Sequence, residues 1–396
     1  MRVEFSAMGL VTDRTDFLFA VRGKTGLIVG MEDIHGSASF FVSTPEVDFA
    51  VSEQGGHLAP VDFYFDEYAV SPYALAPWQP EECDQELPHL LRVLRGDFFC
   101  LPFSEQKQGP PHGEPANEKW SLVEQGERKL VLEIVTADSG ATVRKSIEVR
   151  EGQQAVYVEH LVSGLAGRWN YGNHPILDLS ELAEGQGRLA VSPFRWASVF
   201  DGVFANPATG ETGRLKEGAR FESLERVPCA DGSTLDLTKY PSAPGHEDLV
   251  MMVNEPATAE QPFAWTAVTF DDYVWFSLKN TRDFPSTLFW LSNGGRTARP
   301  WEKRHIGRVG LEEVCSYFCY GVDVSREDRL AGEGIATTRD FAINEVVRLP
   351  IIQGVALVEA GFGQVRSILP RGEHSIEITG DQGQVVIVKI DWQFVL

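Results

Sequence analysis

The stretch from residue 130 to 163 restricts the possible folds of this chain more than any other part of the sequence. It contains three apolar runs, separated by short turns that each carry a glycine, at 130–136, 143–150 and 155–163. In the second run Ile147 and Val149 alternate with Glu148, and this period of two places apolar residues on one face of a strand. Short turns with glycine join antiparallel neighbours. The stretch therefore predicts a three-stranded β-meander.

The same pattern recurs toward both ends of the chain. Further short apolar runs that predict strands cover 17–21, 26–29, 39–42 and 54–63. Near the C-terminus apolar residues alternate with polar ones and predict a last strand with one apolar face, formed by Val388, Ile390, Trp392 and Phe394. One segment, 80–94, differs because its leucines recur at helical spacing, and it predicts a short helix.

The composition agrees with an all-β architecture. The chain has 37 glycines and 22 prolines for turns, and its 24 Phe, 9 Trp and 9 Tyr can fill a large core. No low-complexity linker divides the sequence, whereas residues 201–247 are rich in loop signals and are expected to cover a functional site. We therefore expect one domain over residues 1–396, with most of it folded as two packed antiparallel sheets.

Charge and cysteine content exclude several classes of partner. The 35 basic and 57 acidic residues give a net charge of −22, so nucleic acid and anionic membrane surfaces are poor partners. Five cysteines without a CxxC pair are typical of free thiols in a reducing compartment. The N-terminus lacks the apolar run of a signal peptide, and no segment approaches the roughly 20 apolar residues of a membrane helix. These features predict a cytoplasmic protein.

The tripeptide Asn173-His174-Pro175 presents a histidine inside a segment that otherwise predicts a strand. Pro175 lacks an N–H and biases His174 toward an extended backbone, so the imidazole is expected at a strand end or bulge. Histidine is the side chain whose ordinary pKa lies nearest neutrality, which suits proton transfer. A hydrogen-bonded structural histidine would explain the pattern equally well.

Two further polar residues lie in stretches that could form a cleft. Arg95, followed by Gly96, could project its five-donor guanidinium toward a ligand, or it could form a surface ion pair with Asp97. His112 lies between two prolines and Gly113, where the backbone can approach a ligand closely. On residue type alone, His112 could equally be structural.

A third group of candidates lies in the second half of the chain. Glu312 has an apolar residue before it, and partial desolvation there would raise its pKa as a general base requires. Its neighbour Glu313 would point to the opposite face of a strand, and both could instead be solvated. Trp290 belongs to an aromatic run over 289–301 that could provide flat platforms for a ligand or could be core.

Residues 246–248 combine a histidine with two carboxylates at the start of an apolar strand. Three successive residues of a strand cannot all face one ion, and no HxH or HxxxH spacing supports a metal. No phosphate loop, nucleophile elbow or dinucleotide fingerprint is present. We expect neither a metal nor another cofactor.

Taken in order, these motifs resemble the aldose 1-epimerase (galactose mutarotase-like) superfamily. The matching pieces span about residues 50–320 and run from the glycine-rich strand through Arg95-Gly96-Asp97, Pro111-His112-Gly113, Asn173-His174-Pro175 and Leu311-Glu312. The arginine and His-Gly pieces are most similar to the hexose-6-phosphate epimerase branch. The resemblance implies a large antiparallel β-supersandwich that binds a sugar.

The resemblance also implies a role for each candidate. Glu312 would be the general base and His174 the general acid of an isomerase that interconverts sugar anomers, without metal or cofactor. His112, Arg95 and Asp248 would hold the sugar hydroxyls. Separately from the resemblance, Trp290 of the aromatic run is the candidate platform for a sugar face. The chain departs from the family pattern at Glu114, Ile176 and Glu313, which affects the identity of the substrate most.

Two other functions remain open on the sequence. A carbohydrate-binding protein without catalysis could use the same scaffold and the same aromatic residues. A polysaccharide lyase or hydrolase would require a tyrosine base or paired carboxylates along a groove, and the sequence offers no clear set of these.

Overall fold

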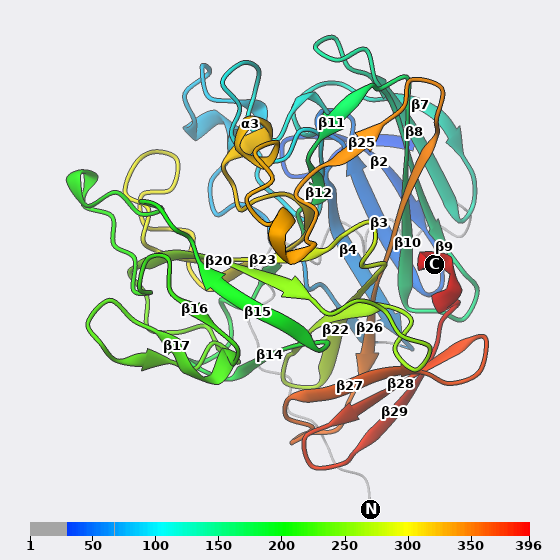
Figure 1. Cartoon of the computed structure of the whole chain (residues 1–396). Coiled ribbons are helices and arrows are strands. Elements are labelled where there is room, and N and C mark those ends of the chain that lie inside the picture. The colour runs from blue at the N-terminus through cyan, green and yellow to red at the C-terminus, as the bar shows by residue number, and fades with distance from the viewer. Residues whose placement is uncertain (1–29, 67) are drawn as a thin grey trace, which may run out of the picture.

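A computed structural model describes residues 30–66 and 68–396 of the chain (Figure 1). The strands expected at 17–21 and 26–29 lie outside the described residues. Elsewhere nearly all regular structure is strand, and every strand pair in the sheets is antiparallel. The all-β class expected from the sequence is therefore confirmed.

The larger of the two main sheets has nine strands and contains the expected meander at 130–163. The meander forms as predicted, because each apolar run pairs with the next through a short turn. The strands follow one another across the sheet in the order β19 (Lys239–Tyr240), β14 (Gly187–Val191), β21 (Ala264–Thr269), β22 (Tyr273–Lys279), β26 (Val347–Leu357), β10 (Ala155–Ser163), β9 (Thr142–Val149), β8 (Lys129–Val135) and β7 (Ser121–Gln125).

The second main sheet has eight strands. Its order is β16 (Arg220–Phe221), β15 (Phe194–Val199), β20 (His246–Asn254), β23 (Ser286–Asn293), β24 (Arg308–Cys315), β12 (Tyr171–Asn173) and β6 (Phe99–Cys100), with β13 (Ile176–Asp178) also paired to β24. Glu312 lies on β24, and His174 lies between β12 and β13, which both pair with β24.

Smaller sheets and short turns surround these two layers. The remaining strands are β1 (Gly30–Asp33), β2 (Ala38–Ser43), β3 (Val47–Ser52), β4 (Leu58–Phe65) and β5 (Tyr68–Val70) in one sheet, β27 (Val365–Pro370), β28 (Ser375–Gly380) and β29 (Val385–Lys389) in another, and the pairs β11 (Gly167–Trp169) with β25 (Arg339–Phe341) and β17 (Val227–Pro228) with β18 (Thr234–Leu235).

The helical parts of the described chain are all short: η1 (Pro80–Glu82), α2 (His89–Arg92), η2 (Glu114–Ala116), η3 (Pro207–Thr209), η4 (Leu224–Arg226), α3 (Gly321–Ser325), η5 (Ala331–Glu333) and η6 (Trp392–Val395). The short helix expected within 80–94 forms as α2, and the separate 3-10 turn η1 precedes it. Pro88 precedes α2, and a proline fits only at the first turn of a helix.

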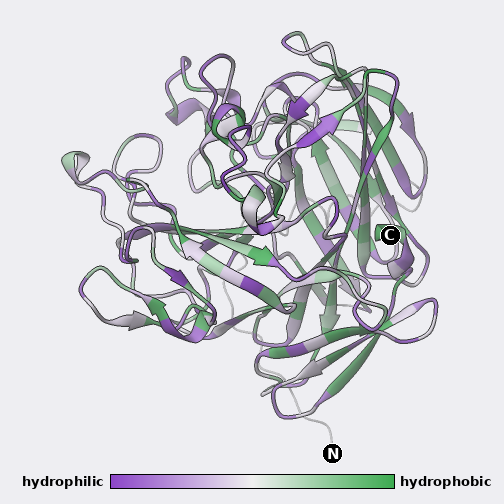
Figure 2. Cartoon of the chain, in the orientation of Figure 1, coloured by the Kyte–Doolittle hydropathy of each residue, from purple (hydrophilic) through white to green (hydrophobic). Residues whose placement is uncertain are grey.

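The eight-stranded sheet is buried on both faces. One face packs against the nine-stranded sheet in the largest hydrophobic core, and the other packs against loops in a second core that includes Trp78, Phe98, Leu249 and Trp290. Strands buried on both faces consist of continuous apolar runs. This explains the sequence of β23, whose residues are all buried, and Figure 2 shows hydrophobic residues concentrated along the strands.

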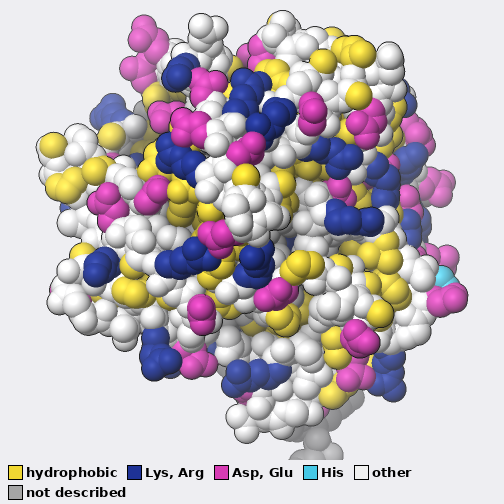
Figure 3. All heavy atoms as spheres, in the orientation of Figure 1, with side chains coloured by type: hydrophobic (Ala, Val, Ile, Leu, Met, Phe, Trp, Pro, Cys, Tyr) yellow, Lys and Arg dark blue, Asp and Glu magenta, His cyan; other side chains and the backbone are white. Residues whose placement is uncertain are grey.

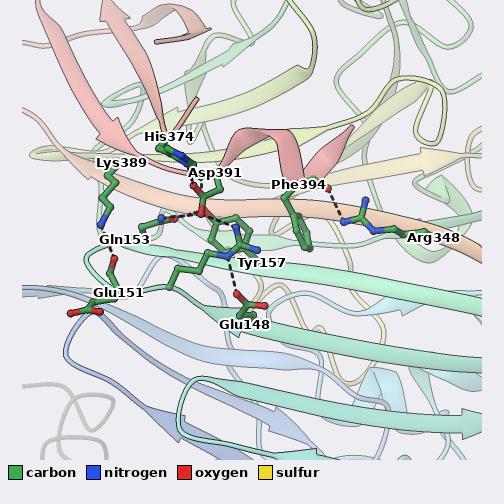
Figure 4. A network of polar contacts seen from close by, with 10 residues as sticks. Glu148, Glu151, Gln153, Tyr157, Arg348, His374, Lys389, Asp391 and Phe394 are labelled. Atoms are coloured by element: carbon green, nitrogen blue, oxygen red, sulfur yellow. Dashed lines mark hydrogen bonds and ion pairs between the residues drawn. The ribbon is translucent and has the colours of Figure 1, made fainter. Parts of the chain in front are cut away.

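The C-terminal sheet packs on the outer face of the nine-stranded sheet in a third core. Its carboxyl end is fixed by Asp391, which accepts hydrogen bonds from Arg150 (2.7 Å) and Gln153 (3.3 Å) and contacts His374 Nδ1 at 2.6 Å (Figure 4). The last strand ends at Lys389 and the following residues form η6. The strand expected through Phe394 is thus too long, because the chain turns at Asp391.

The visible face of the molecule carries acidic and basic side chains interspersed, with hydrophobic ones between them (Figure 3). Within the described residues no helix is long and apolar enough to cross a membrane. All five cysteines are free thiols, and four of them are buried.

A buried ion pair joins the two main sheets. Glu313 of β24 contacts Lys279 of β22, and both side chains are completely buried. Thr266 and Thr287 add hydrogen bonds to the Glu313 carboxylate, at 2.5 and 2.9 Å. A buried charge is tolerated only when it is paired and hydrogen-bonded in this way.

We expect Lys279→Met to lower the free energy of unfolding by about 3–5 kcal/mol, because it leaves the Glu313 carboxylate buried without a counter-charge. Urea denaturation measures this loss. The double variant Lys279→Met/Glu313→Leu is the matched control and should regain most of the stability, since it buries no charge. A single variant as stable as the wild-type protein would contradict the role of the pair.

Candidate active site

A pocket of about 590 Å³ opens on the face of the eight-stranded sheet that lies away from the nine-stranded sheet. The sheet contributes Leu249, Trp290 and Glu312 to the pocket floor. Leucines in and next to α2 form one wall, and the loop after β15 forms another. His174 and His112 also line the pocket, so four of the six predicted site residues meet there.

Strand register brings His174 and Glu312 together. Asn173 at the end of β12 pairs with Glu313, and Ile176 at the start of β13 pairs with Gly310, so His174 lies directly opposite Glu312 on the same face. Directly opposed residues of antiparallel strands have adjacent side chains. His174 Nε2 lies 3.2 Å from Glu312 Oε1, and both side chains are nearly fully buried.

Burial shifts the pKa values of the two groups in opposite directions. Loss of solvent raises the pKa of Glu312 well above its ordinary value and lowers the pKa of His174 well below its own, with the nearby His112 lowering it further. Both shifts favour the uncharged forms. In its uncharged form the pair is a protonated carboxyl group that faces a neutral imidazole.

Aromatic rings fix the orientation of His174. Phe98 stacks on the imidazole with a centroid distance of 4.5 Å, and Trp290 meets it edge-on at 5.7 Å. The indole Nε1 of Trp290 donates to Glu247 at 2.7 Å, which fixes the ring. The sequence left open whether Trp290 is core or ligand platform, and its ring both packs in the second core and lines the pocket.

The backbone of His174 is held from the side of the protein interior. Its N–H donates to Phe98 O (3.0 Å) and to Asp97 Oδ1 (2.9 Å), while Asp97 Oδ2 accepts from Gln353 of β26 at 2.9 Å. Asp97 therefore links the site to the nine-stranded sheet. The alternative of a surface ion pair between Asp97 and Arg95 is wrong.

His112 is held as a neutral hydrogen-bond donor. The backbone N–H of Ser104 donates to His112 Nδ1 at 3.3 Å, so the ring proton lies on Nε2. Burial lowers the pKa of His112 to about 3. A side chain on Gly113 would meet Leu101 O at 2.1 Å, so the glycine permits the close approach that places the histidine.

Gly310 makes room for the carboxyl group. It precedes Glu312 by two residues on the same face of β24, and a side chain there would meet Glu312 Oε1 at 2.8 Å and Trp290 Cβ at 3.1 Å. Only glycine leaves the carboxyl group in its position beside His174.

Arg95 is a correction to the expected site. The structure buries it outside the pocket, where its guanidinium donates to the backbone oxygens of Val93, Ile34 and His35 at 2.8–3.0 Å and to Ser37 Oγ at 3.1 Å. Its donors are used to hold the turn between β1 and β2. Residue type alone does not distinguish this structural use of Arg95 from ligand binding.

Asp248 is the second correction. In β20 the residue that faces the pocket is Leu249, so strand alternation directs Asp248 to the opposite face. Its carboxylate accepts hydrogen bonds from the backbone N–H groups of Arg214 (3.0 Å) and Leu215 (2.9 Å). It holds the loop at 201–247 in place.

Arg296 is one of the pocket residues that the sequence prediction missed, and it brings a positive charge to the lining. It lines the pocket with its guanidinium 4.8 Å from the centre of the Phe204 ring. The available signal was its position directly after Gly294-Gly295 at the end of β23, where a strand from the pocket floor ends. Among the described residues no group of three metal-ligating side chains converges, and His246 to Asp248 form no such group.

Comparison with known proteins identifies the fold. No family model and no curated protein sequence matches the chain. Solved structures do: a candidate aldose 1-epimerase from Klebsiella pneumoniae has a TM-score of 0.56 at 12% identity, covering 84% of this chain and 83% of that one.

Two further solved structures agree with the first. A galactose mutarotase-like protein from Clostridium acetobutylicum has a TM-score of 0.54 at 10% identity, covering 85% of this chain and 100% of that one. A candidate aldose 1-epimerase from Escherichia coli K12 has 0.52 at 14%, covering 83% and 100%. The chain has the galactose mutarotase-like fold that the sequence resemblance predicted.

The pKa directions predict how His174 titrates. Because its folded-state pKa is lowered, the imidazole should stay neutral at pH 6.5, near the pKa of an exposed histidine, and gain a proton only in more acidic solution. Imidazole ¹⁵N NMR measures this, with the signal assigned by its loss in His174→Gln. A His174 ring already charged at neutral pH would show instead that the proton rests on the imidazole.

Proposed function

We propose that the protein is an isomerase that interconverts the anomers of an aldose, with Glu312 and His174 as its acid/base pair. The observation that carries the proposal is the 3.2 Å contact between these groups at the floor of a pocket, in a galactose mutarotase-like fold. His112 and Trp290 would bind the sugar, through the Nε2–H donor and the ring respectively.

Contact between the two groups suits the geometry of a cyclic hemiacetal. The anomeric hydroxyl and the ring oxygen are bonded to the same carbon, so two adjacent side chains can reach both. In the charged form of the pair, the Glu312 carboxylate removes the hydroxyl proton as the C1=O bond forms. The bond from C1 to the ring oxygen breaks, and that oxygen takes a proton from the His174 imidazolium.

After this step the pair is uncharged, which is the form that burial favours. Rotation about the C1–C2 bond then turns the other face of the aldehyde toward the released hydroxyl. Neutral His174 removes the hydroxyl proton as the ring closes, and protonated Glu312 returns one to the aldehyde oxygen. The 3.2 Å contact lets the proton pass between the groups, so the pair is ready for either anomer.

Neutral His112 would support the same steps. Its Nε2–H can donate to a sugar oxygen without adding a charge next to His174, whose ring centroid lies 5.0 Å away. A positively charged neighbour would make His174 hold its own proton less tightly and would disturb the proton exchange with Glu312. The free thiols and the pocket chemistry fit an enzyme of the cytoplasm that acts on a small carbohydrate.

A second candidate is a carbohydrate-binding protein without catalysis. The direct contact between His174 and Glu312 favours it, because each group occupies the hydrogen-bonding position of the other until a ligand separates them. Sugar binding seen by calorimetry with no acceleration of anomer exchange would support this candidate over the isomerase.

Glu312→Gln should slow anomer exchange by about 10²–10⁴-fold, because the amide can neither accept nor return the proton. NMR exchange spectroscopy on a panel of aldoses measures the rate above the spontaneous reaction. The fold should be kept, since glutamine has the shape and neutrality of the protonated carboxyl group.

The matched control is the same substitution at Glu118, which is exposed and lies outside the pocket lining. Glu118→Gln should exchange anomers at the wild-type rate. Equal rates in the Glu312→Gln variant and the wild-type protein would remove Glu312 from the mechanism.

A further inference from the structure

The pocket extends beyond the acid/base pair into an apolar part that we call the annex, formed by Phe200, Val203, Phe204 and Tyr320. Phe200 contacts Phe204 at 5.7 Å and stacks on Tyr320 at 4.6 Å between ring centres. The rings that contact His174 are different ones: Phe98, Phe103, His112 and Trp290. The annex is thus a separate surface from the one that surrounds the acid/base pair.

The volume of the pocket exceeds the needs of one sugar ring. Cavities of about 300–1,000 Å³ hold drug-sized ligands, and this pocket has about 590 Å³. A single hexose would fill the end at His174 and Glu312 and leave the annex open. A ligand that fills the whole pocket must therefore carry a second group.

The one hydroxyl group of the annex is already hydrogen-bonded. The hydroxyl of Tyr320 donates to Asp201 at 2.8 Å. Leu249 lies between the annex and Trp290. The backbone oxygen of Leu249 accepts a hydrogen bond from the N–H of Phe200, and Leu249 pairs with Trp290 across the β20–β23 ladder. A second sugar ring would need free donors and acceptors around its hydroxyls, so the lining favours an apolar group.

The charges beside the annex disfavour a phosphate. Arg296 is its cation, and two buried carboxylates, Glu211 at 3.6 Å and Glu247 at 3.7 Å, lie against the guanidinium. Burial raises the pKa of Glu247 to about 7, and Glu211 lies against the same guanidinium as a second carboxyl group. A phosphate dianion is held by cations that are not compensated in this way.

We propose that the ligand of this pocket is a neutral aldose that carries an apolar aryl or acyl substituent on a carbon remote from the anomeric centre. The anomeric carbon lies at His174 and Glu312, and the substituent lies in the annex. The placement of the anomeric carbon rests on the proposed function, whereas the placement of the apolar substituent rests on the residues that line the annex.

The test compares six sugars: glucose, galactose, their 6-O-benzyl ethers and their 6-phosphates. NMR exchange spectroscopy gives kcat/KM for anomer exchange, and calorimetry gives the dissociation constants. Burying the benzyl ring should raise kcat/KM and tighten binding about tenfold or more over the parent sugar, while the 6-phosphate should show no gain.

A variant pair locates the effect. Val203 is 69% exposed in the annex, and Val135 is 64% exposed on β8, outside the pocket lining. Val203→Ser should lower the ratio of benzyl ether to parent sugar by about threefold or more, because it removes apolar contact from the substituent. Val135→Ser should leave that ratio unchanged, and neither exposed valine is needed for folding.

The outcomes separate this inference from the proposed function. Acceleration of the parent sugars without a gain for the benzyl ether, or with a gain for the phosphate, would overturn the inference and leave the isomerase standing. If no sugar is accelerated, the isomerase fails. In that case the annex is still supported if the benzyl ether binds more tightly than the parent sugar and Val203→Ser weakens this binding. If the benzyl ether and the parent sugar bind equally, the proposed role of the annex is overturned.

Discussion

The antiparallel register of β24 against β12 and β13 determines where the two candidate acid/base groups lie. It places His174 opposite Glu312 at the one point where Pro175 interrupts the strand, and the resulting contact is 3.2 Å. The proline removes a backbone donor without changing the register, and the ladder resumes with Leu311 N–H donating to Pro175 O at 2.9 Å. A shift of the register by one residue would turn His174 and Glu312 toward opposite faces.

The two consecutive glutamates of β24 show how one strand serves two purposes. Glu312 faces the pocket, where burial raises its pKa and favours the protonated form. Glu313 faces the interior, where it forms an ion pair with Lys279 that ties the two sheets together. The difference comes from the partner available on each face: a neutral imidazole on one and an ammonium group on the other. The inner pair ties β24 to the nine-stranded sheet and so holds Glu312 in its position at the pocket.

Much of the fold and part of the candidate site could be predicted from the sequence. The meander at 130–163 follows from alternation and glycine turns, and Glu312 and His174 meet as the motif resemblance implied. The prediction that Arg95 binds the sugar failed because residue type does not reveal that three backbone oxygens already accept its hydrogen bonds. The prediction that Asp248 binds the sugar failed because β20 is buried on both faces. Its sequence therefore shows no alternation of polar and apolar residues that would reveal which face Asp248 occupies. Arg296 and the annex depend on loops that come together only in three dimensions.

The most direct test of this account is a crystal structure of the protein with a bound aldose that it anomerises. We expect the anomeric hydroxyl to lie within hydrogen-bond distance of the Glu312 carboxylate, and the ring oxygen within that distance of His174 Nε2. A sugar bound with its anomeric carbon turned away from both side chains would contradict the central claim.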